Sequence, residues 1–221
     1  MGLPQATIVR FVATILSHRG LWATPAERNS LAALCASFAR GFGVETDIRD
    51  RDGDLVVSHD PPSGGEPSLA EMLEARREVT AGPLALNVKA DGLQPAIAQA
   101  LADAGDPEYF VFDMSIPDTV GYRRAGLRYF TRQSEYEPQP ALYDAAAGVW
   151  LDCFEGEWFH RELIAGHLDA GKQVCVVSPE LHGRDRAGAW EGWCDWDVFT
   201  SSDVLLCTDF PVQAAAAFGP A

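Results

Sequence analysis

Residues 84–113, LALNVKADGLQPAIAQALADAGDPEYFVFD, carry the pattern that decides the fold. Two short apolar runs, at 84–89 and 109–113, flank a helix-length segment at 94–104. Short apolar runs bounded by Gly and Pro favour buried strands, and the longer segment between them favours a helix. The stretch therefore predicts a strand–helix–strand unit, which requires parallel strands joined by a right-handed crossover.

The same alternation continues in both directions along the chain. Further strands are expected at 11–17, 43–49, 127–131, 149–153, 173–178 and 204–208, and an Asp52-Gly53 turn is expected to fold 54–58 back on 43–49 as a hairpin. Helices are expected at 30–41, 68–77, 117–125, 161–170, 187–193 and 211–217. Eight strand positions in 221 residues favour the α/β class and a closed (β/α)8 TIM barrel over an open sheet. Without repeats or long linkers, residues 1–221 are expected to form a single domain with no sizeable insertion.

The composition of the chain excludes some classes of binding partner. Lys and Arg number 17 and Asp and Glu 32, a net charge of −15 that disfavours nucleic acid and anionic lipid. The most apolar stretch, 8–16, is too short for a membrane span, contains Arg10 and lacks a small-residue cleavage site. We therefore expect a cytoplasmic protein without stable membrane insertion, whose oligomeric state stays open. The cysteines lack C-x-x-C spacing, which predicts neither a disulfide framework nor a zinc finger but small core residues: Cys35, Cys153, Cys175, Cys194 and Cys207.

Barrel active sites lie at the carboxyl ends of the strands, so polar residues at those positions are candidates. They are His18, Arg19, Glu45, Asp47, His59, Asp60, Asn87, Lys89, Asp113, Arg132, Asp152, Ser178, Thr208 and Asp209. Glu45 and Asp47 are two residues apart on one strand, so both side chains point to the same side. Two such carboxylates need positive charge between them. A hard divalent cation, Mg²⁺ or Ca²⁺, meets this need, as does an ion pair with Arg19, Lys89 or Arg49.

Histidines supply the second half of the chemistry. His18 and His59 can act as general base and general acid near neutral pH, although a strand-end histidine can equally be structural. His160, His167 and His182 are expected at the surface. Lys89, one of only two lysines, either binds an anion or snorkels from its strand end. Four aromatic residues could wall a pocket, although core packing is the commoner role: Trp150, Phe154, Trp158 and Phe159.

Three segments together carry a family resemblance: HRG at 18–20, ETD at 45–47 and DGDLVVSHD at 52–60. In this order and spacing they resemble the glycerophosphodiester phosphodiesterase family. That family belongs to the barrel superfamily that includes phosphatidylinositol-specific phospholipase C and spider-venom phospholipase D. LNVK at 86–89 resembles the third-strand motif of the family, and TDFP at 208–211 resembles its closing motif. An Asp before a Pro at a helix start is also ordinary capping sequence.

The resemblance implies metal-dependent hydrolysis of a phosphodiester, a glycerophosphodiester or related small head-group diester, and so a place in lipid metabolism. It assigns His18 and His59 as the acid–base pair. Glu45 and Asp47 would hold Mg²⁺ or Ca²⁺. Arg19 and Lys89 would bind the phosphate of the small phosphodiester substrate.

Two departures from the family pattern qualify this reading. Asn87 stands where the family usually has a glutamate that ligates the metal. Asp152, and next Asp113, are the candidates for a compensating metal ligand, although each could equally be a structural hydrogen-bond acceptor. Only residues 60–67 stand where many members carry an insertion, so the substrate stays open. Two alternatives remain: a lyase-type reaction that releases a cyclic phosphate, and a non-catalytic anion-binding barrel with a weakened metal site.

Overall fold

The protein is described by a computed structural model over residues 13–77 and 79–219. The first half of the chain runs β1 (Thr14–His18), η1 (Pro25–Glu27), α1 (Leu31–Phe38), β2 (Gly43–Arg51), β3 (Asp54–Val57), α2 (Leu69–Arg77), β4 (Leu84–Val88), α3 (Gln94–Asp103), β5 (Tyr109–Phe112) and α4 (Ile116–Arg124). The second half runs β6 (Phe130–Gln133), η2 (Tyr143–Ala145), β7 (Gly148–Leu151), α5 (Arg161–Asp169), β8 (Gln173–Val177), η3 (Pro179–His182), α6 (Ala187–Trp193), η4 (Asp197–Thr200), β9 (Val204–Thr208) and α7 (Pro211–Phe218).

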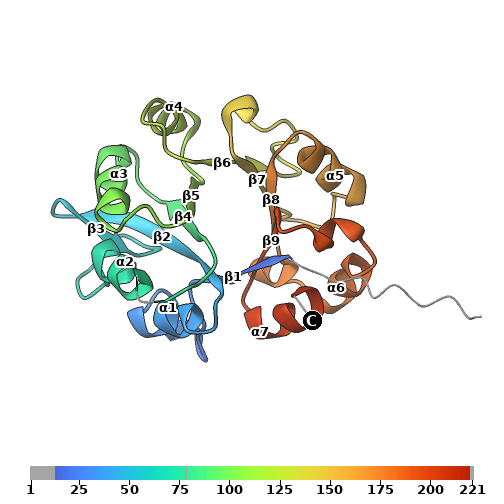
Figure 1. Cartoon of the computed structure of the whole chain (residues 1–221), viewed down its shortest axis with the longest axis horizontal. Coiled ribbons are helices and arrows are strands. Elements are labelled where there is room, and N and C mark those ends of the chain that lie inside the picture. Colours follow the sequence, from blue (N-terminus) through green and yellow to red (C-terminus); the bar gives the residue numbers. More distant parts are fainter. Residues whose placement is uncertain (1–12, 78, 220–221) are drawn as a thin grey trace, which may run out of the picture.

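The strands form one parallel sheet in the order β5-β4-β2-β1-β9-β8-β7-β6. A parallel bridge between Val111 and Tyr129 brings its two edges together, and the Val111 amide donates to the Arg128 carbonyl at 3.0 Å. The result is a nearly closed barrel surrounded by helices, which confirms the predicted (β/α)8 TIM fold (Figure 1).

The short strand β3 lies outside this path and pairs with β2 in antiparallel fashion. Asp52 and Gly53 connect the two strands with φ angles of +54° and +96°. Two consecutive residues at positive φ are typical of a tight hairpin turn, so the predicted hairpin is confirmed.

Two predicted boundaries need comment. Residues 11 and 12 of the expected first strand lie outside the described residues, and so do residues 8–12 of the apolar stretch. The sixth strand begins at Phe130, not at 127 as expected. Gly126 (φ +73°) and Leu127 form the turn that ends α4, and the Leu127 amide donates to the Tyr122 carbonyl at 3.1 Å. Leu127 is therefore a buried residue of a helix-ending turn, and its apolar character reflects this burial rather than a strand.

Side chains from alternate strand positions fill the barrel interior, as pleated strands require. They form one buried cluster of Leu16, Ala85, Phe110, Phe112, Phe130, Trp150, Cys175, Val177, Leu205 and Cys207. Two ring stacks fix its shape, Phe110 on Phe130 with centroids 3.7 Å apart and Phe112 on Trp150 at 3.9 Å. This apolar cluster fills the barrel interior. The polar residues at the carboxyl ends of the strands lie above it and form the floor of the barrel mouth.

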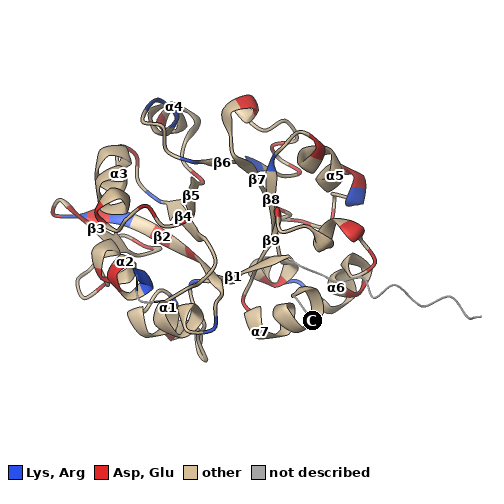
Figure 2. Ribbon diagram, in the orientation of Figure 1, with Lys and Arg blue, Asp and Glu red and all other residues tan. Residues whose placement is uncertain are grey.

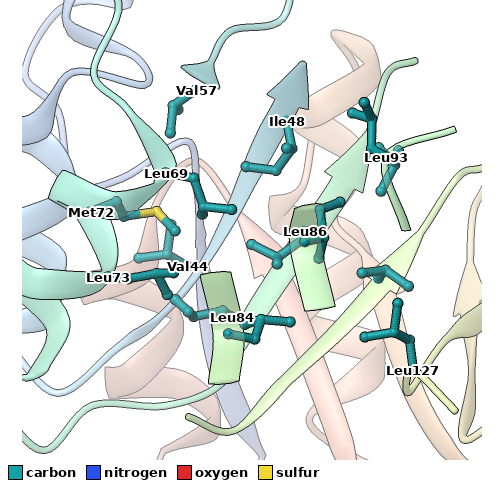
Figure 3. Packing of buried hydrophobic residues seen from close by; sticks show 14 of the residues in the cluster. Val44, Ile48, Val57, Leu69, Met72, Leu73, Leu84, Leu86, Leu93 and Leu127 are labelled. Carbon is teal, nitrogen blue, oxygen red and sulfur yellow. The ribbon is translucent and has the colours of Figure 1, made fainter. Parts of the chain in front are cut away.

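The opposite strand faces pack against the helices. Figure 3 shows Val44, Ile48, Leu84 and Leu86 from β2 and β4 facing a row of helical side chains, Leu69, Met72 and Leu73. All of these side chains are buried. Each buried side chain of this size contributes roughly 1.5–3 kcal/mol of hydrophobic stabilisation, which holds β2 and β4 where the polar residues at their ends require.

Acidic residues lie on helices around the ring, from α2 to α6 (Figure 2). None of the helices in residues 13–77 and 79–219 combines the length and apolar character that crossing a bilayer requires. All five cysteines are free. Cys153, Cys175 and Cys207 are buried, as expected for core residues, whereas Cys35 and Cys194 are only partly buried.

Candidate active site

The HRG segment folds as a tight turn at the carboxyl end of β1. Arg19 and Gly20 both have positive φ, +60° and +93°. A Cβ on Gly20 would lie 2.6 Å from the carbonyl carbon of Ala33 in α1, so only glycine fits. The Arg19 amide donates to the Glu45 carbonyl at 2.8 Å, which lays the turn across the neighbouring strand β2. The local sequence thus places His18 and Arg19 beside the two carboxylates of β2.

His18 is oriented by Asp209, which follows β9. Its Nδ1 lies 2.6 Å from Asp209 Oδ1. An ionised carboxylate can only accept, so Nδ1 carries the proton, and Nε2 faces Glu45 Oε2 at 3.8 Å. Arg28 Nη2 holds the other Asp209 oxygen at 2.8 Å, while its guanidinium lies 4.4 Å from the ring centre of Trp22. His18 therefore presents one defined nitrogen to the barrel mouth.

Glu45, Asp47 and Asn87 form the floor of the mouth. All three are buried, at 2%, 0% and 8% exposed, and Asp47 and Asn87 are direct neighbours in the β2–β4 ladder. Asn87 Nδ2 donates to Glu45 Oε1 at 3.3 Å. One oxygen of each side chain is buried without a hydrogen bond: Glu45 Oε2, Asp47 Oδ1 and Asn87 Oδ1.

The two carboxylates differ in their partners. Asp47 is surrounded by donors, with Arg19 Nε and Asn29 Nδ2 each 2.9 Å from Oδ2 and Lys89 Nζ 3.4 Å from Oδ1. Burial and the charge of Asp47 raise the pKa of Glu45 to about 7, against the opposing effects of His18, Arg19 and Lys89. The ion pair that the sequence offered as an alternative to a metal is thus formed by Asp47. Glu45 forms no ion pair with an Arg or Lys side chain in the described residues.

The donor set fits a hard divalent ion. Three buried oxygens without hydrogen bonds are costly unless something else satisfies them, and oxygen is the ligand atom that Mg²⁺ and Ca²⁺ prefer. In the described part of the chain, no group of three His, Cys, Asp or Glu side chains is arranged to hold a metal. The third oxygen of this set comes from the amide of Asn87, outside those four residue types.

Lys89 bridges the floor to the far wall. Its Nζ lies 3.5 Å from Asp113 Oδ2 as well as 3.4 Å from Asp47 Oδ1, and its side chain is 18% exposed. Asp113 also accepts from Arg132 Nη1 at 2.6 Å. Arg49, the third cation considered from sequence, instead donates to the His59 carbonyl at 2.9 Å.

Asp152 directly follows β7 at the same end of the barrel, and its carboxylate is bound by other groups. Its Oδ1 lies 2.6 Å from His182 Nε2 and accepts from the Cys153 amide at 2.9 Å. His182 was expected at the surface and is only partly exposed, with 22% of its side chain accessible, because the η3 turn after β8 brings its ring against Asp152. His182 is the fifth residue after β8 ends at Val177, and this closeness to a strand end is the signal that sequence reasoning overlooked.

His167 was also expected at the surface and is buried, with its Nε2 2.7 Å from Gln133 Oε1 and its Nδ1 2.8 Å from the Tyr143 hydroxyl. Burial lowers its pKa. His160 is exposed, as expected, and its ring caps α5. Among the aromatic residues considered for a pocket wall, Trp150 and Phe159 are core residues, while Phe154 is half-buried with its ring centre 4.9 Å from that of His182.

His59 lies farther out. Its side chain is half-exposed, and Nδ1 lies 2.9 Å from Asp60 Oδ1. Among the described residues no hydrogen bond or ion pair joins it to His18, Glu45 or Asp47. It lines a surface hollow of about 450 Å³ together with Arg28 and Asn29, the same residues that contact Asp209 and Asp47. His59 is therefore linked to the floor of the mouth only indirectly, through Arg28 and Asn29.

Comparisons with known proteins address the fold. No protein-family model matches this chain, and no curated protein matches it. A glycerophosphodiester phosphodiesterase from Agrobacterium tumefaciens is similar in structure, with a TM-score of 0.69 and 20% identity over 93% of this chain and 100% of that one. Another from Parabacteroides distasonis has a TM-score of 0.67 and 16% identity, over 95% and 98% of the two chains.

A Ca²⁺-dependent phosphatidylinositol-specific phospholipase C from Streptomyces antibioticus is more distant, with a TM-score of 0.51 and 12% identity over 96% of this chain and 98% of that one. At these identities the likeness describes the fold. The chain has the same barrel fold as these two glycerophosphodiester phosphodiesterases and, more distantly, as this phospholipase C.

Proposed function

We propose that this protein is a phosphodiesterase that hydrolyses a small glycerophosphodiester or related head-group diester with the aid of a bound Mg²⁺ or Ca²⁺. The observation that carries the proposal is the floor of the mouth, where His18 Nε2 faces Glu45 beside three buried oxygens without hydrogen bonds. The shared fold with glycerophosphodiester phosphodiesterases supports the same reaction class.

Each residue has a role in this proposal. Glu45, Asp47 and Asn87 hold the ion, which when bound would supply Lewis-acid polarisation of the phosphoryl group. Asp152 stays the alternative ligand, although its Oδ1 is already taken up by His182 and the Cys153 amide.

The remaining residues bind the phosphate and move protons. Arg19 and Lys89 place two positive charges at the mouth, which together with the bound ion would reverse the potential of the acidic protein locally and stabilise the charge that develops on phosphorus. Asp209 fixes the tautomer of His18, which accepts or donates a proton at Nε2. His59 is the other member of the acid–base pair and exchanges a proton with the second reacting oxygen on phosphorus. The half-exposed position of His59 suits a group that meets the leaving alcohol near solvent.

A panel of phosphodiesters, assayed with and without a chelator, tests the proposal. We expect turnover of at least one glycerophosphodiester, loss of activity with the chelator and recovery on adding Mg²⁺ or Ca²⁺. Phosphorus NMR of the product separates hydrolysis, which gives a monoester, from a lyase-type reaction, which gives a cyclic phosphate. Activity that persists in chelator would contradict metal dependence, and binding without turnover across the panel would indicate an anion-binding barrel instead.

A further inference from the structure

The charges at the floor of the mouth cancel within the protein. Glu45 and Asp47 contribute −2 when ionised, and Arg19 and Lys89, which lie 2.9 and 3.4 Å from Asp47, contribute +2. A divalent ion would therefore enter a site without net negative charge. A carboxylate at position 87 would leave a net charge of −1, but the amide of Asn87 is neutral.

One oxygen, Asp47 Oδ1, can interact either with Lys89 or with a divalent ion. Asp47 Oδ1 lies 3.4 Å from Lys89 Nζ, an ion-pair distance, but makes no hydrogen bond and so remains available as a ligand atom. Lys89 and a divalent ion would compete for this oxygen by direct Coulomb repulsion. Lys89 keeps a second acidic partner if it leaves Asp47, because its Nζ also lies 3.5 Å from Asp113 Oδ2.

Phosphate relieves this competition. A phosphodiester anion that draws Lys89 and Arg19 toward its oxygens would free Asp47 for the ion and would add a negative charge to the site. The ion in turn would attract the phosphodiester. By thermodynamic linkage each ligand must then raise the affinity of the site for the other by the same factor.

We propose that Asn87 makes binding of the divalent ion conditional on substrate: the ion binds weakly to the free protein and tightly together with a phosphodiester. Asn87 is thus a residue that determines ion affinity, and Lys89 is the counter-charge that the substrate displaces. The inference rests on the proposed function because it needs both ligands at this site.

Calorimetric titration at fixed pH tests the coupling without any turnover. Mg²⁺, and separately Ca²⁺, is titrated into the protein in the presence of dimethyl phosphate, the simplest phosphodiester anion, or of sodium chloride at the same ionic strength. For the wild type we expect dimethyl phosphate to lower the Kd for the ion by roughly tenfold, within the range of measured couplings between sites.

Two variants each make the net charge of the site more negative by one unit, in different ways. Asn87→Glu adds the missing negative charge, and Lys89→Met removes the competing positive charge. Each should bind the ion more tightly than the wild type in chloride, and in each the effect of dimethyl phosphate should shrink to less than half of the wild-type factor. Lys172→Met is the matched control. Lys172, the only other lysine, stands just before β8 and donates to the carbonyls of Asp144 and Ala146, which precede β7 at the opposite end of the barrel. This variant should titrate as the wild type.

Equal wild-type affinities in dimethyl phosphate and chloride would overturn the inference, and so would weaker ion binding by both Asn87→Glu and Lys89→Met. If that result accompanies chelator-sensitive hydrolysis, the proposed function stands and only the coupling falls. If no ion binds under either condition, both fall. Thermal unfolding of each variant identifies one that has failed to fold, and the other variant then decides.

Discussion

At the scale of single residues, the site is defined by where polar atoms are left without partners. His18 is held by Asp209 at one ring nitrogen only, and the floor carboxylates and amide each keep one oxygen free. Most buried polar groups in proteins are paired, so these three oxygens at one mouth support the proposed ligand site.

The two histidines give the first prediction. Replacing His18 or His59 with Ala should lower turnover of a phosphodiester by roughly 10²- to 10⁴-fold, the contribution expected of a general acid or base. His160→Ala, which removes an exposed ring at the start of α5, should leave turnover within about twofold. Steady-state kinetics and circular dichroism of all three variants provide the measurement. A histidine whose removal leaves activity near normal has no part in proton transfer.

Glu45 gives a prediction about stability and pH. Its pKa in the folded protein is about 7, above the ordinary 4.5, because burial and Asp47 disfavour the ionised form. The folded protein therefore holds this proton more tightly than the unfolded chain, and the contribution of Glu45 to the free energy of unfolding falls as pH rises from about 4.5 to 7. The loss is at most about 1.4 kcal/mol per pH unit from this group.

Urea unfolding of wild type and Glu45→Gln between pH 5 and 8, in chelator, measures this effect. The wild type should lose stability relative to Glu45→Gln as pH rises to about 7, and the difference should level off above that pH. Parallel stability curves for the two proteins would show that Glu45 does not hold a proton in the folded state.

At the scale of elements, the barrel wall depends on glycines where strands and rings approach closely. A Cβ at Gly148 of β7 would lie 2.5 Å from Phe130 Cζ and 2.6 Å from the Gln173 carbonyl oxygen. Phe130 is the ring that stacks on Phe110 inside the barrel, so it has little freedom to retreat. The missing side chain at 148 is thus part of the interior packing.

Gly148→Ala should therefore destabilise the protein by roughly 1–3 kcal/mol, the usual cost of overpacking a core. Gly166→Ala in α5 makes a matched control, since nothing lies within 4 Å of its Cβ position. That variant should gain roughly 0.4–1 kcal/mol from the lower entropy of the unfolded chain. Urea unfolding of the two variants decides, and equal stability changes would refute the packing argument.

At the scale of the whole molecule, the barrel has a seam between β5 and β6. Neighbouring strands elsewhere pair over several residues, as β1 does with β9 from Thr14 to Ser17. At the seam, the bridge between Val111 and Tyr129 stands in place of a ladder in the described chain. Side chains close it instead, with the Phe110–Phe130 stack inside and the Arg132–Asp113 ion pair at the mouth.

Hydrogen exchange should reveal this seam. Backbone amides in residues 109–112 and 130–133 should exchange faster than those in 14–18 and 204–208, because fewer ladder hydrogen bonds protect them. Arg132→Gln should raise exchange at the seam further, whereas Arg161→Gln, which breaks the surface pair with Asp197, should not. Uniform protection around the barrel would contradict this picture.

The sequence by itself determined the alternation of strands and helices and hence the barrel. Period-two patterning in strands and turn residues such as Asp52-Gly53 act locally, so they can be read without knowing what lies nearby in space. The same local reading placed His18, Glu45, Asp47 and Lys89 at strand ends. The local pattern was misleading at Leu127, because a buried helix-ending turn and a buried strand can both contain an apolar residue at this position.

Only the tertiary structure decided which charges meet. Asp209 and His18 are far apart in sequence, as are His182 and Asp152, and nothing in their local sequence signals the pairing. The barrel brings β9 beside β1 and folds the turn after β8 over the end of β7. Ion pairs and unpartnered oxygens depend on distances of a few ångströms between separate strand ends, and those distances are set by closure of the sheet rather than by any local pattern.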